Sequence, residues 1–477
     1  MEHKSSPKIK STNRRVDFYG GIYGALLPFV VFIIGVVSIA LSGAPDEKGF
    51  WPVIIFSLAI GLVLSKNKKE FSEAVIDGMS ERIVMIMIVA WILASIIGVL
   101  MTSTGFVEAL LWLSEQIDLG PIGYTVCCFI MCCIVSLSTG SSFATILICA
   151  PLLYPSGGLL GCHLPTLAGA IIAGATFGDF SAPISDTTIA SALSQNADIG
   201  KTVKSRIKYI FPATVLALIG FVISSDQNQG ALIESKLNEA SDPKGLVMIL
   251  IPVVIIWLFI RGTHLIHGLI YGLLFGIIVA LLSGLMPVNM LLSLDLENFT
   301  AKSFIIDGIN RVVGISFFTI LLMGLVGAIK SSGVIDHFIN FFEKNSSSRI
   351  QTESRIVGII WAAVMLTTHS IVAILVVSDY INKTNESGIG SVRRANIMSL
   401  IVCIFPFLLP YFIPVILMSN MTKTGQEFGI DSVGALEVGF HNFIAWALLI
   451  IVFISIVLGF GREHDNSLSN KTELYGE

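Results

Sequence analysis

Long apolar runs recur along the 477-residue sequence, and they restrict its fold more than any other feature. A helix needs about 20 residues to cross the hydrocarbon core of a bilayer, and inside that core its backbone must be satisfied by the protein. Only 13% of the residues are charged, 54% are hydrophobic, and the mean hydropathy is +0.84. We therefore predict an all-α polytopic membrane protein with about 10–12 transmembrane segments. The clearest predicted spans lie at about 19–42, 50–65, 83–102, 209–224, 246–260, 264–286, 311–330 and 441–460.

Charge and cysteine content exclude several other classes of protein. The formal net charge is −4, and no basic tract indicates nucleic-acid binding. Six of the seven cysteines lie in apolar stretches, so disulfides are not expected to organise the fold. Cys128 and Cys132 share a helix face, but no histidine or carboxylate is near them in sequence, and we predict no resident metal site. No nucleophile, cofactor or nucleotide motif occurs in a suitable context, so an enzyme is not expected.

Basic residues beside the first two spans predict their orientation. Arg14 and Arg15 precede the first span, and the basic stretch 66–69 follows the second. Lysine and arginine favour cytoplasmic loops, so the N-terminus and this loop are expected in the cytoplasm. The first span has no small-residue cleavage site and is expected to remain in the membrane. Residues 67–82 and 288–310 are predicted to be surface helices.

Residues 174–192 place two carboxylates inside a segment that otherwise resembles a membrane helix. An ionisable residue in lipid is costly, and by default it indicates function. A proline at 183 disfavours helix before it, so we predict a helix break where carbonyl and hydroxyl oxygens can bind a small hard cation such as Na⁺. The predicted ion-binding and proton-binding residues are Asp179, Asp186, Ser185, Thr187 and Thr188, with Gly178 and Pro183 at the break.

A polar stretch interrupts the apolar segment 121–154 near its middle. It consists of Ser138, Thr139, Gly140, Ser141 and Ser142. Two interpretations remain open: one long interrupted crossing, or a re-entrant hairpin with the polar stretch at its tip. The hairpin is favoured, because non-helical backbone at depth is tolerated where it lines a protein cavity. Its polar groups would then contact ion or substrate, whereas the structural alternative is that they only satisfy the interrupted backbone.

The second half of the chain repeats these landmarks at an offset of about 228 to 230 residues. Residues 76–79 resemble 306–309, while an interrupted segment at 354–378 and a proline-broken span at 395–420 match the first-half breaks. Loop charges give the halves opposite orientations, so we predict an inverted repeat with two re-entrant hairpins and two broken helices. The second-half residues predicted to contact ion or substrate are Thr368, His369 and Ser370, with Pro410 at the helix break.

This pattern divides the chain into five predicted regions. Residues 1–70 form an N-terminal tail and two transmembrane helices, and 71–224 form the first repeat unit. Residues 225–298 link the units, 299–460 form the second unit, and 461–477 are a polar cytoplasmic tail.

The first-half motifs resemble the signature of a known family. Residues 178–188, Gly-Asp-Phe-Ser-Ala-Pro-Ile-Ser-Asp-Thr-Thr, are similar to the motif of the NhaC-type sodium/proton antiporter family, a branch of the ion-transporter superfamily. Residues 139–142, Thr-Gly-Ser-Ser, resemble a second motif of that family. Length, number of spans and repeat spacing agree along nearly the whole chain. Two positions depart from the pattern: Ala182 stands where a serine is usual, and Phe143 where a tryptophan is often found.

The resemblance implies a secondary active antiporter that exchanges Na⁺ for H⁺ across the cytoplasmic membrane of a bacterium, without a cofactor. The transported Na⁺ would be its only metal. The family also contains malate/lactate antiporters and amino-acid transporters, so a Na⁺- or H⁺-coupled exchanger of a small organic substrate is the alternative. By analogy with other inverted-repeat transporters, a homodimer within membrane lipid is a further expectation.

Two carboxylates in one cavity would account for exchange. Desolvation and mutual repulsion would let the pair hold a proton, and competition with Na⁺ for the site then yields antiport. Asp186 is expected to be the main ion ligand and Asp179 its proton partner, with a helix cap as the structural alternative for Asp179. His369 suits proton coupling, anion binding or packing. No lysine or arginine is evident deep within a span, which favours a cation over an organic anion.

Overall fold

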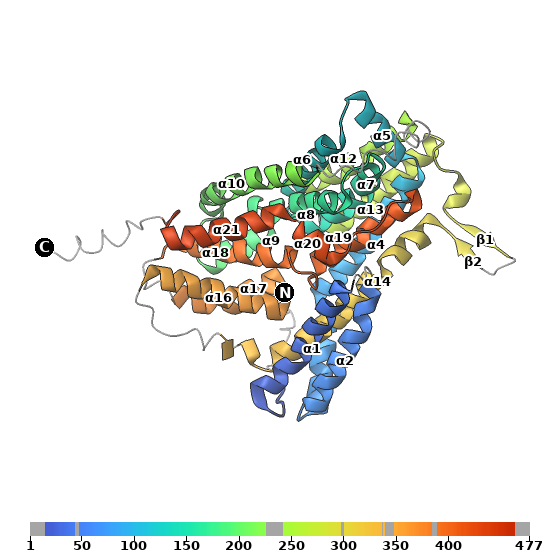
Figure 1. The fold of residues 1–477 in the computed structure, drawn as a ribbon. Helices are drawn as coiled ribbons and strands as arrows, with labels where there is room; N and C mark the ends of the chain where they lie inside the picture. The colour runs from blue at the N-terminus through green and yellow to red at the C-terminus, as the bar shows by residue number, and fades with distance from the viewer. Residues whose placement is uncertain are drawn as a thin grey trace, which may run out of the picture.

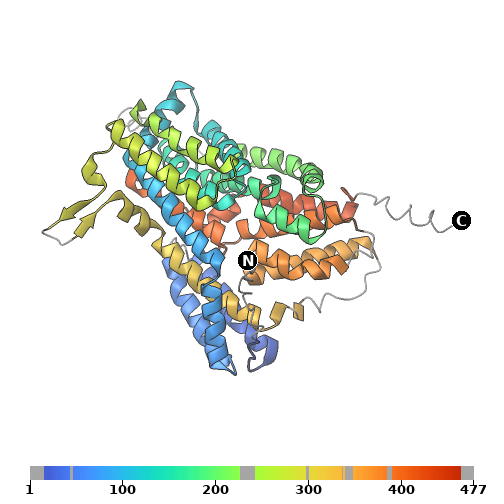
Figure 2. The ribbon, with the colours of Figure 1, turned by 180° about the vertical axis from the view of Figure 1, so that it is seen from behind.

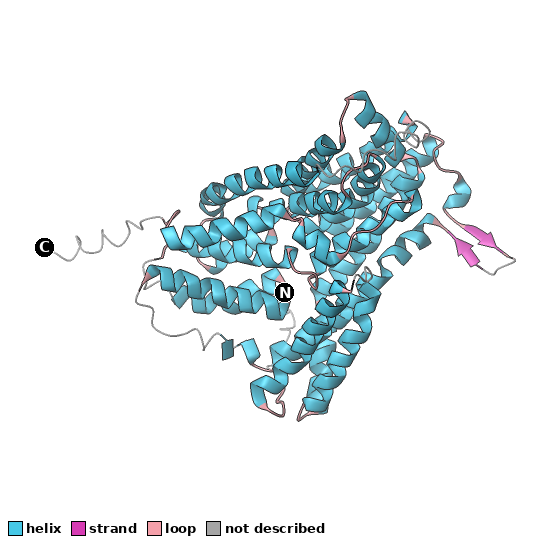
Figure 3. Cartoon of the chain, viewed as in Figure 1, coloured by secondary structure: helices cyan, strands magenta, loops and turns pink. Residues whose placement is uncertain are grey.

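The computed structural model describes residues 15–42, 47–225, 242–296, 300–335, 337–338, 348–383 and 389–462. Within these ranges the chain is helical apart from one small β-hairpin (Figure 3). Nine segments of the described chain are long and apolar enough to cross a membrane, and three shorter apolar helices accompany them. The protein is therefore a multi-pass membrane protein, as predicted, whereas the exact number of spans stays a prediction. The N-terminal lysines, most of the 225–244 loop and the tail after Arg462 lie outside the described residues.

Two apolar helices begin the fold and lie side by side (Figures 1 and 2). They are α1 (Gly21–Leu41) and α2 (Phe50–Leu64), and a 3₁₀ turn, η1 (Glu47–Gly49), precedes α2. The predicted surface helix follows as α3 (Lys68–Met79), and the side chain of Asn67 caps its start. A long span, α4 (Arg82–Ser103), and a short helix, α5 (Phe106–Gln116), complete this part of the chain.

Helices α6 (Pro121–Thr139) and α7 (Ser142–Leu159) fold back on one another as a hairpin. Their outer ends meet, because the Cys162 thiol donates to the Pro121 carbonyl at 3.3 Å and the Tyr124 hydroxyl donates to the Leu153 carbonyl at 3.4 Å. A single interrupted crossing would place these ends on opposite sides. The segment therefore folds back on itself and is not one interrupted crossing, while a re-entrant position in the membrane stays a prediction.

The predicted broken helix consists of α8 (Leu164–Ser181) and α9 (Asp186–Ser194), and α10 (Ile199–Ser225) follows it. Helix α8 packs very closely on α6. The Ser136 hydroxyl accepts from the Gly178 N–H at 2.9 Å and donates to the Ala175 carbonyl. A Cβ atom at Gly178 would lie 2.0 Å from the Ser136 Oγ. Gly178 therefore lies within α8, where it serves this close contact, and not at the break where we predicted it.

A β-hairpin stands where we predicted a surface helix at 288–310, so that prediction is wrong. Strands β1 (Ser293–Asp295) and β2 (Thr300–Lys302) pair in antiparallel fashion and project from the helices (Figure 1). Leucine alternates with polar residues over 292–296, and this period of two favours a strand. The elements before β1 are η2 (Pro243–Ile249), α12 (Leu250–Ile260), α13 (Leu265–Leu282) and η3 (Val288–Met290).

The second half contains a second helix pair and a second interrupted helix. Helix α14 (Phe304–Ser331) leads to α16 (Arg349–Thr367) and α17 (Ser370–Lys383), which lie side by side in Figures 1 and 2. The interrupted helix consists of α18 (Ser391–Ile404), η5 (Phe405–Phe407) and α19 (Ile413–Thr422). The remaining elements are η6 (Lys423–Phe428), α20 (Ala435–Phe440) and α21 (Phe443–Leu458).

Two glycines at equivalent positions of the halves make reciprocal contacts. A Cβ at Gly78 of α3 would lie 2.2 Å from the Met323 carbonyl oxygen and 2.9 Å from the Gly327 Cα of α14. A Cβ at Gly308, in the matching motif of α14, would lie 2.6 Å from the Ile96 Cα of α4. Adding the repeat offset of about 228 to 230 residues to the position of Ile96 gives a position in α14 between Met323 and Gly327, the two residues that Gly78 contacts. The halves thus pack on each other through matching contacts.

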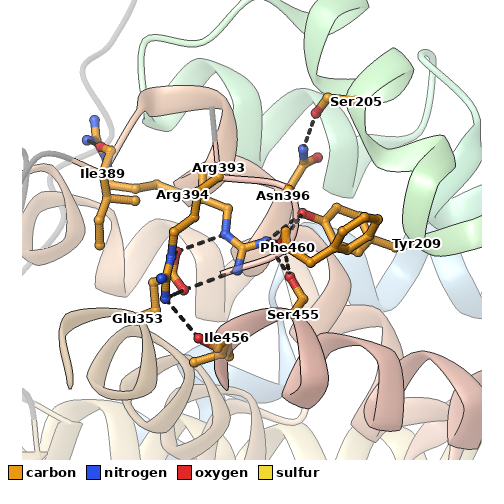
Figure 4. Close-up of polar contacts among 12 residues, drawn as sticks. Ser205, Tyr209, Glu353, Ile389, Arg393, Arg394, Asn396, Ser455, Ile456 and Phe460 are labelled. Atoms are coloured by element: carbon orange, nitrogen blue, oxygen red, sulfur yellow. Dashed lines mark hydrogen bonds and ion pairs between the residues drawn. The ribbon is translucent and has the colours of Figure 1, made fainter. Parts of the chain in front are cut away.

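A buried ion cluster joins α16, α18, α21 and α10 (Figure 4). The Glu353 carboxylate accepts from Arg393 Nε at 2.9 Å and Nη2 at 3.1 Å. Arg462 donates to the same carboxylate from Nη2 at 2.9 Å. Arg393 Nη1 also donates to the hydroxyls of Tyr209 at 2.5 Å and Ser455 at 2.7 Å. Arg462, near the start of the predicted polar tail, is therefore held against the helices.

Replacing Glu353 by glutamine should destabilise the protein strongly, because two arginines then face a neutral amide in a buried site. We expect Glu353→Gln to lower the free energy of unfolding by about 3–5 kcal/mol, measured by denaturant titration in detergent micelles. Glu427→Gln is the matched control, since Glu427 pairs with Arg311 while 56% of its side chain is exposed. That change should cost less than about 1 kcal/mol. Equal effects of the two substitutions would contradict the structural role of the cluster.

Candidate functional site

The break between α8 and α9 leaves backbone carbonyl groups without a helical donor, and side chains donate hydrogen bonds to them. The Asp179 carbonyl accepts from the hydroxyls of Thr187 at 2.9 Å and Thr188 at 3.2 Å. The Phe180 carbonyl accepts from Arg206 Nη1 at 2.8 Å. These carbonyls, which we expected to be free for an ion, are therefore already paired within the protein.

The Asp179 carboxylate caps the first turn of α7. Its Oδ1 accepts from the Ser142 N–H at 3.1 Å, and its Oδ2 accepts from the Ser142 hydroxyl at 2.6 Å. The side chain of Asp179 is buried, with 9% of its surface exposed. A carboxylate is favoured at a helix N-terminus, where unpaired N–H groups and the helix dipole meet it. The alternative interpretation of Asp179 was a helix cap. Asp179 does cap a helix, but that helix is α7 of the hairpin and not a helix at the break beside Asp179.

Asp186 is the first residue of α9 and differs from Asp179 in its surroundings. Its side chain is exposed, and no described residue donates a hydrogen bond to its carboxylate. The hydroxyls of Ser185 and Thr187 lie 3.0 Å apart beside it in the chain. The Cys403 thiol of α18 donates to the Thr187 hydroxyl at 3.5 Å. Asp186 is therefore a carboxylate at the edge of the break that has no partner among the described residues.

The tips of the two helix pairs have the same local geometry. Gly140, between α6 and α7, has a φ of +65°, and Thr368, between α16 and α17, has a φ of +51°. The Thr139 hydroxyl donates to the Ser141 carbonyl at 3.3 Å. The Thr367 hydroxyl donates at the same distance to the carbonyl of the equivalent residue in the second tip, His369. Each tip is thus a left-handed turn closed by a threonine.

A cavity of about 150 Å³ lies where both tips and both helix breaks meet. Among the residues that line it, acidic and other polar side chains come from the first break and the two tips. None of the lining residues is a lysine or an arginine. Apolar side chains of α4, α7, α13, α17, η5 and α19 form the rest of the wall. Of the residues predicted for the site, those that line the cavity are Gly140, Ser141, Ser142, Asp179, Ser185, Asp186, Thr187, Thr368, His369 and Ser370.

Other predicted site residues lie away from this cavity. The Ser138 hydroxyl donates to the Ile134 carbonyl at 2.8 Å within α6, and Thr139 is engaged in the tip turn. Thr188 is buried behind the break, where its hydroxyl also accepts from Arg206 Nη1 at 3.0 Å. In the second break Pro410 is buried apart from the cavity, and the prolines that line the cavity are Pro406 and Pro414.

Arg206 is the main residue that the sequence reasoning missed. We expected no basic residue deep within a span, and we did not expect Arg206, which lies seven residues after the start of the candidate span α10, to be fully buried by the protein. Besides the Phe180 carbonyl, it binds the Asn396 Oδ1 of α18 through Nε at 2.9 Å. A signal for this burial exists in the sequence: Arg206 shares a helix face with Tyr209, Ala213 and other buried residues of α10.

Discontinuous helices that meet at a cavity inside a multi-pass membrane protein are typical of secondary transporters. Comparison with known proteins agrees with this class. Residues 17–225 match the profile of the Na⁺/H⁺ antiporter family. This matched part, 209 of the 477 residues, is similar to the Na⁺/H⁺ antiporter family, and two of the relatives below carry the name NhaC.

Individual relatives are similar to parts of the chain. The malate-2H⁺/Na⁺-lactate antiporter of Bacillus subtilis (strain 168) is 26% identical over 245 residues, 50% of this chain and 49% of the relative. The Na⁺/H⁺ antiporter NhaC of Alkalihalophilus pseudofirmus is 31% identical over 170 residues, 36% of each chain. NhaC of Bacillus subtilis is 26% identical over 196 residues. The chain thus spans half or less of the length of these relatives.

Replacing Arg206 by lysine tests whether the guanidinium positions the break. Lysine keeps the charge, but it lacks the planar fork that reaches Phe180 and Asn396 together. We expect Arg206→Lys to lower the free energy of unfolding in detergent micelles by about 1–3 kcal/mol, because a buried acceptor loses its donor. Lys204→Arg, at an exposed position of the same helix, is the control and should leave the free energy of unfolding unchanged. Equal stability of Arg206→Lys and the wild type would rule out this positioning role.

Proposed function

We propose that this protein is a secondary active antiporter that exchanges Na⁺ for H⁺ at Asp186 and Asp179. The observation that carries the proposal is that both carboxylates line one cavity at the meeting point of the tips and breaks. Carboxylate and hydroxyl oxygens are ligands that hard cations prefer. The absence of lysine and arginine among the cavity-lining residues further supports a cation as the occupant.

The surroundings of the two carboxylates support different roles. No described residue donates to Asp186, so its oxygens are free to bind Na⁺, with the hydroxyls of Ser185 and Thr187 alongside. Asp179 is buried and already accepts two hydrogen bonds from Ser142, and we assign it the role of proton partner. Two negative charges that line one cavity repel each other, so either Na⁺ or a proton stabilises the pair. Competition between these two cations then couples their transport.

We further infer that residues 71–224 and 299–460 are inverted-repeat units that rock around the cavity, with re-entrant hairpins at both tips. The matching tip hydrogen bonds and the reciprocal contacts of Gly78 and Gly308 support this repeat. In this arrangement the broken helices stay at the fixed site while access alternates between the two sides of the membrane. A bacterial cytoplasmic membrane, a cytoplasmic N-terminus and a homodimer remain part of this proposal.

A coupled exchanger of a small organic substrate is the second candidate, and the size of the cavity favours it. A water molecule needs about 10–15 Å³ of such volume, so the cavity of about 150 Å³ exceeds the needs of one dehydrated ion. One relative carries malate and lactate in its name. The same carboxylates would then couple the organic substrate to Na⁺ or H⁺.

Replacing Asp186 by asparagine should abolish exchange, because the amide lacks the charge that draws Na⁺ into the cavity. In liposomes with an imposed pH gradient, we expect added Na⁺ to trigger proton flux through the wild-type protein and at least about 100-fold less through Asp186→Asn. Asp198→Asn is the matched control. Asp198 is exposed and accepts from the Lys201 N–H at 2.7 Å at the start of α10, and asparagine caps equally well.

The outcomes separate the two candidates. Na⁺-triggered flux that Asp198→Asn retains and Asp186→Asn loses supports the Na⁺/H⁺ exchanger. Flux that requires malate, lactate or an amino acid in addition to Na⁺ favours the organic substrate. Equal flux in wild type and Asp186→Asn would exclude the proposed site.

A further inference from the structure

Two histidines from different halves of the chain meet at one end of the helices, away from the cavity. His163 precedes α8, and His441 lies between α20 and α21. Their ring centres are 5.7 Å apart, and the ring planes are inclined by 60°. The backbones also approach closely, since a Cβ at Gly169 of α8 would lie 2.3 Å from the His441 carbonyl oxygen. This contact therefore joins the first proposed repeat unit to the second.

The protein binds the Nδ1 atom of each ring. His441 Nδ1 lies 2.9 Å from the Glu437 carbonyl oxygen, which can only accept, so Nδ1 donates and Nε2 carries the lone pair. His163 Nδ1 lies 2.7 Å from the Thr166 hydroxyl. That hydroxyl can accept from His163, because the Ser224 hydroxyl, 2.7 Å away, can accept its own hydrogen. Histidines that bind a metal are oriented in this way through their other ring nitrogen.

The Nε2 atoms of both rings are left for a ligand. No described residue forms a hydrogen bond with either of them. Both histidines are half-buried, and neither Nε2 is closed off from solvent. The unpartnered Nδ1 of His369 differs in this respect, since it has no contact with solvent. An ion from solution can therefore reach the Nε2 atoms of His163 and His441.

The spacing of the two rings suits a transition-metal ion. Zn²⁺ binds imidazole nitrogen at about 2.0–2.1 Å, so two imidazoles at the tetrahedral angle have ring centres about 5 Å apart. The observed 5.7 Å is close to this value. Burial and the neighbouring His441 ring lower the pKa of His163, and the Glu437 carboxylate acts in the opposite direction. His163 is therefore neutral near pH 7, and the neutral imidazole is the form that binds a metal.

A second histidine pair lacks these features. His264 and His267, at the start of α13, have ring centres 5.5 Å apart. His264 Nδ1 accepts from the Ile266 N–H, so that nitrogen is used as a helix cap. Arg261, three residues earlier, brings a positive charge that disfavours a cation. Both rings also belong to one turn of one helix, so an ion between them would not join the halves of the chain.

We propose that His163 and His441 bind a Zn²⁺ ion from solution through their Nε2 atoms, and that the bound ion holds the two repeat units together and so slows exchange. Among the described residues no three histidine, cysteine or acidic side chains are already grouped around a metal, so water completes the coordination. The exposed Glu437 carboxylate adds a favourable negative charge. The effect on exchange rests on the proposed function, because it requires units that move, whereas zinc binding does not.

Zinc binding to the purified full-length protein in lipid nanodiscs tests the site by isothermal titration calorimetry. We expect His163→Gln and His441→Gln each to weaken zinc binding at least about tenfold. The double variant should lose little more than either single variant, because both rings bind the same ion. Mg²⁺ prefers oxygen ligands and should not compete with Zn²⁺. His267→Gln is the matched control from the second histidine pair, and it should bind zinc like the wild type.

A further variant tests the orientation of the first ligand. Thr166→Val leaves both histidines in place and removes the hydroxyl that binds His163 Nδ1. Loss of such a partner typically costs about tenfold or more in metal affinity, and we expect zinc binding to fall by about tenfold. Zinc affinity equal to that of the wild type would contradict the assignment of Nε2 as the ligand atom of His163.

Proton flux in liposomes tests the effect of the ion, with EDTA as the zinc-free reference. We expect Zn²⁺ on both sides of the membrane to reduce the Na⁺-triggered flux at least about tenfold in the wild type and in His267→Gln, and to leave the flux of His441→Gln unchanged. Equal zinc affinity of the wild type and His441→Gln would overturn the site. Zinc binding without an effect on flux would overturn the proposed slowing of exchange. Absence of flux even in EDTA would instead overturn the proposed exchange, and the titration would still decide whether the site exists.

Discussion

A helix break within a bilayer must find hydrogen-bond partners in the protein, and the rest of this structure depends on how that requirement is met. The carbonyls of Asp179 and Phe180 lose their helical donors where α8 ends. Hydroxyls of α9 satisfy the first, and Arg206 of α10 satisfies the second. Because Arg206 is also bound to Asn396 of α18, the geometry of the first break is tied to a helix of the second half.

The need for hydrogen-bond partners within the protein also explains the structure of the two tips between α6 and α7 and between α16 and α17. Each tip ends one helix and starts another, so it leaves carbonyls on one side and N–H groups on the other. Threonine hydroxyls at 139 and 367 satisfy carbonyls at both tips. The N–H groups differ, since Asp179 serves those of α7 and no described residue serves those of α17. An unsatisfied donor in a cavity is costly unless water or a ligand reaches it, so the difference between the tips bears on function.

Much of the membrane fold could be predicted because its signals are local. Glycine at 140 and proline at 183 interrupt apolar runs, and the structure breaks its helices there. The repeat offset then located the second tip at 368. Contacts between distant residues could not be predicted in this way. Ser142 and Asp179 are 37 residues apart, and only the fold of the hairpin against α8 brings the serine to the carboxylate.

Arg206 shows why local signals also mislead. It lies among Lys201, Lys204 and Lys208, a pattern typical of the cytoplasmic end of a span, and the sequence alone assigns all four to one charged surface. The helix turns Arg206 onto the face that packs against α8 and α18, while Lys201 and Lys204 remain exposed. Burial of a basic residue depends on the acceptors that tertiary packing supplies. Those acceptors come from Phe180, Thr188 and Asn396, and the last is 190 residues away.

The position of Arg206 also bears on the geometry of the site. Its guanidinium binds the carbonyl of the residue after Asp179 and the hydroxyl two residues after Asp186, and among the described residues no carboxylate pairs with it. Because these contacts join neutral groups on both sides of the break, Arg206 acts on the two aspartates through the backbone that carries them. A movement of α10 away from α8 would break these hydrogen bonds and displace both carboxylates. Under the proposed exchange, the buried arginine thus holds the two carboxylates in one arrangement, and competition between Na⁺ and H⁺ depends on that arrangement.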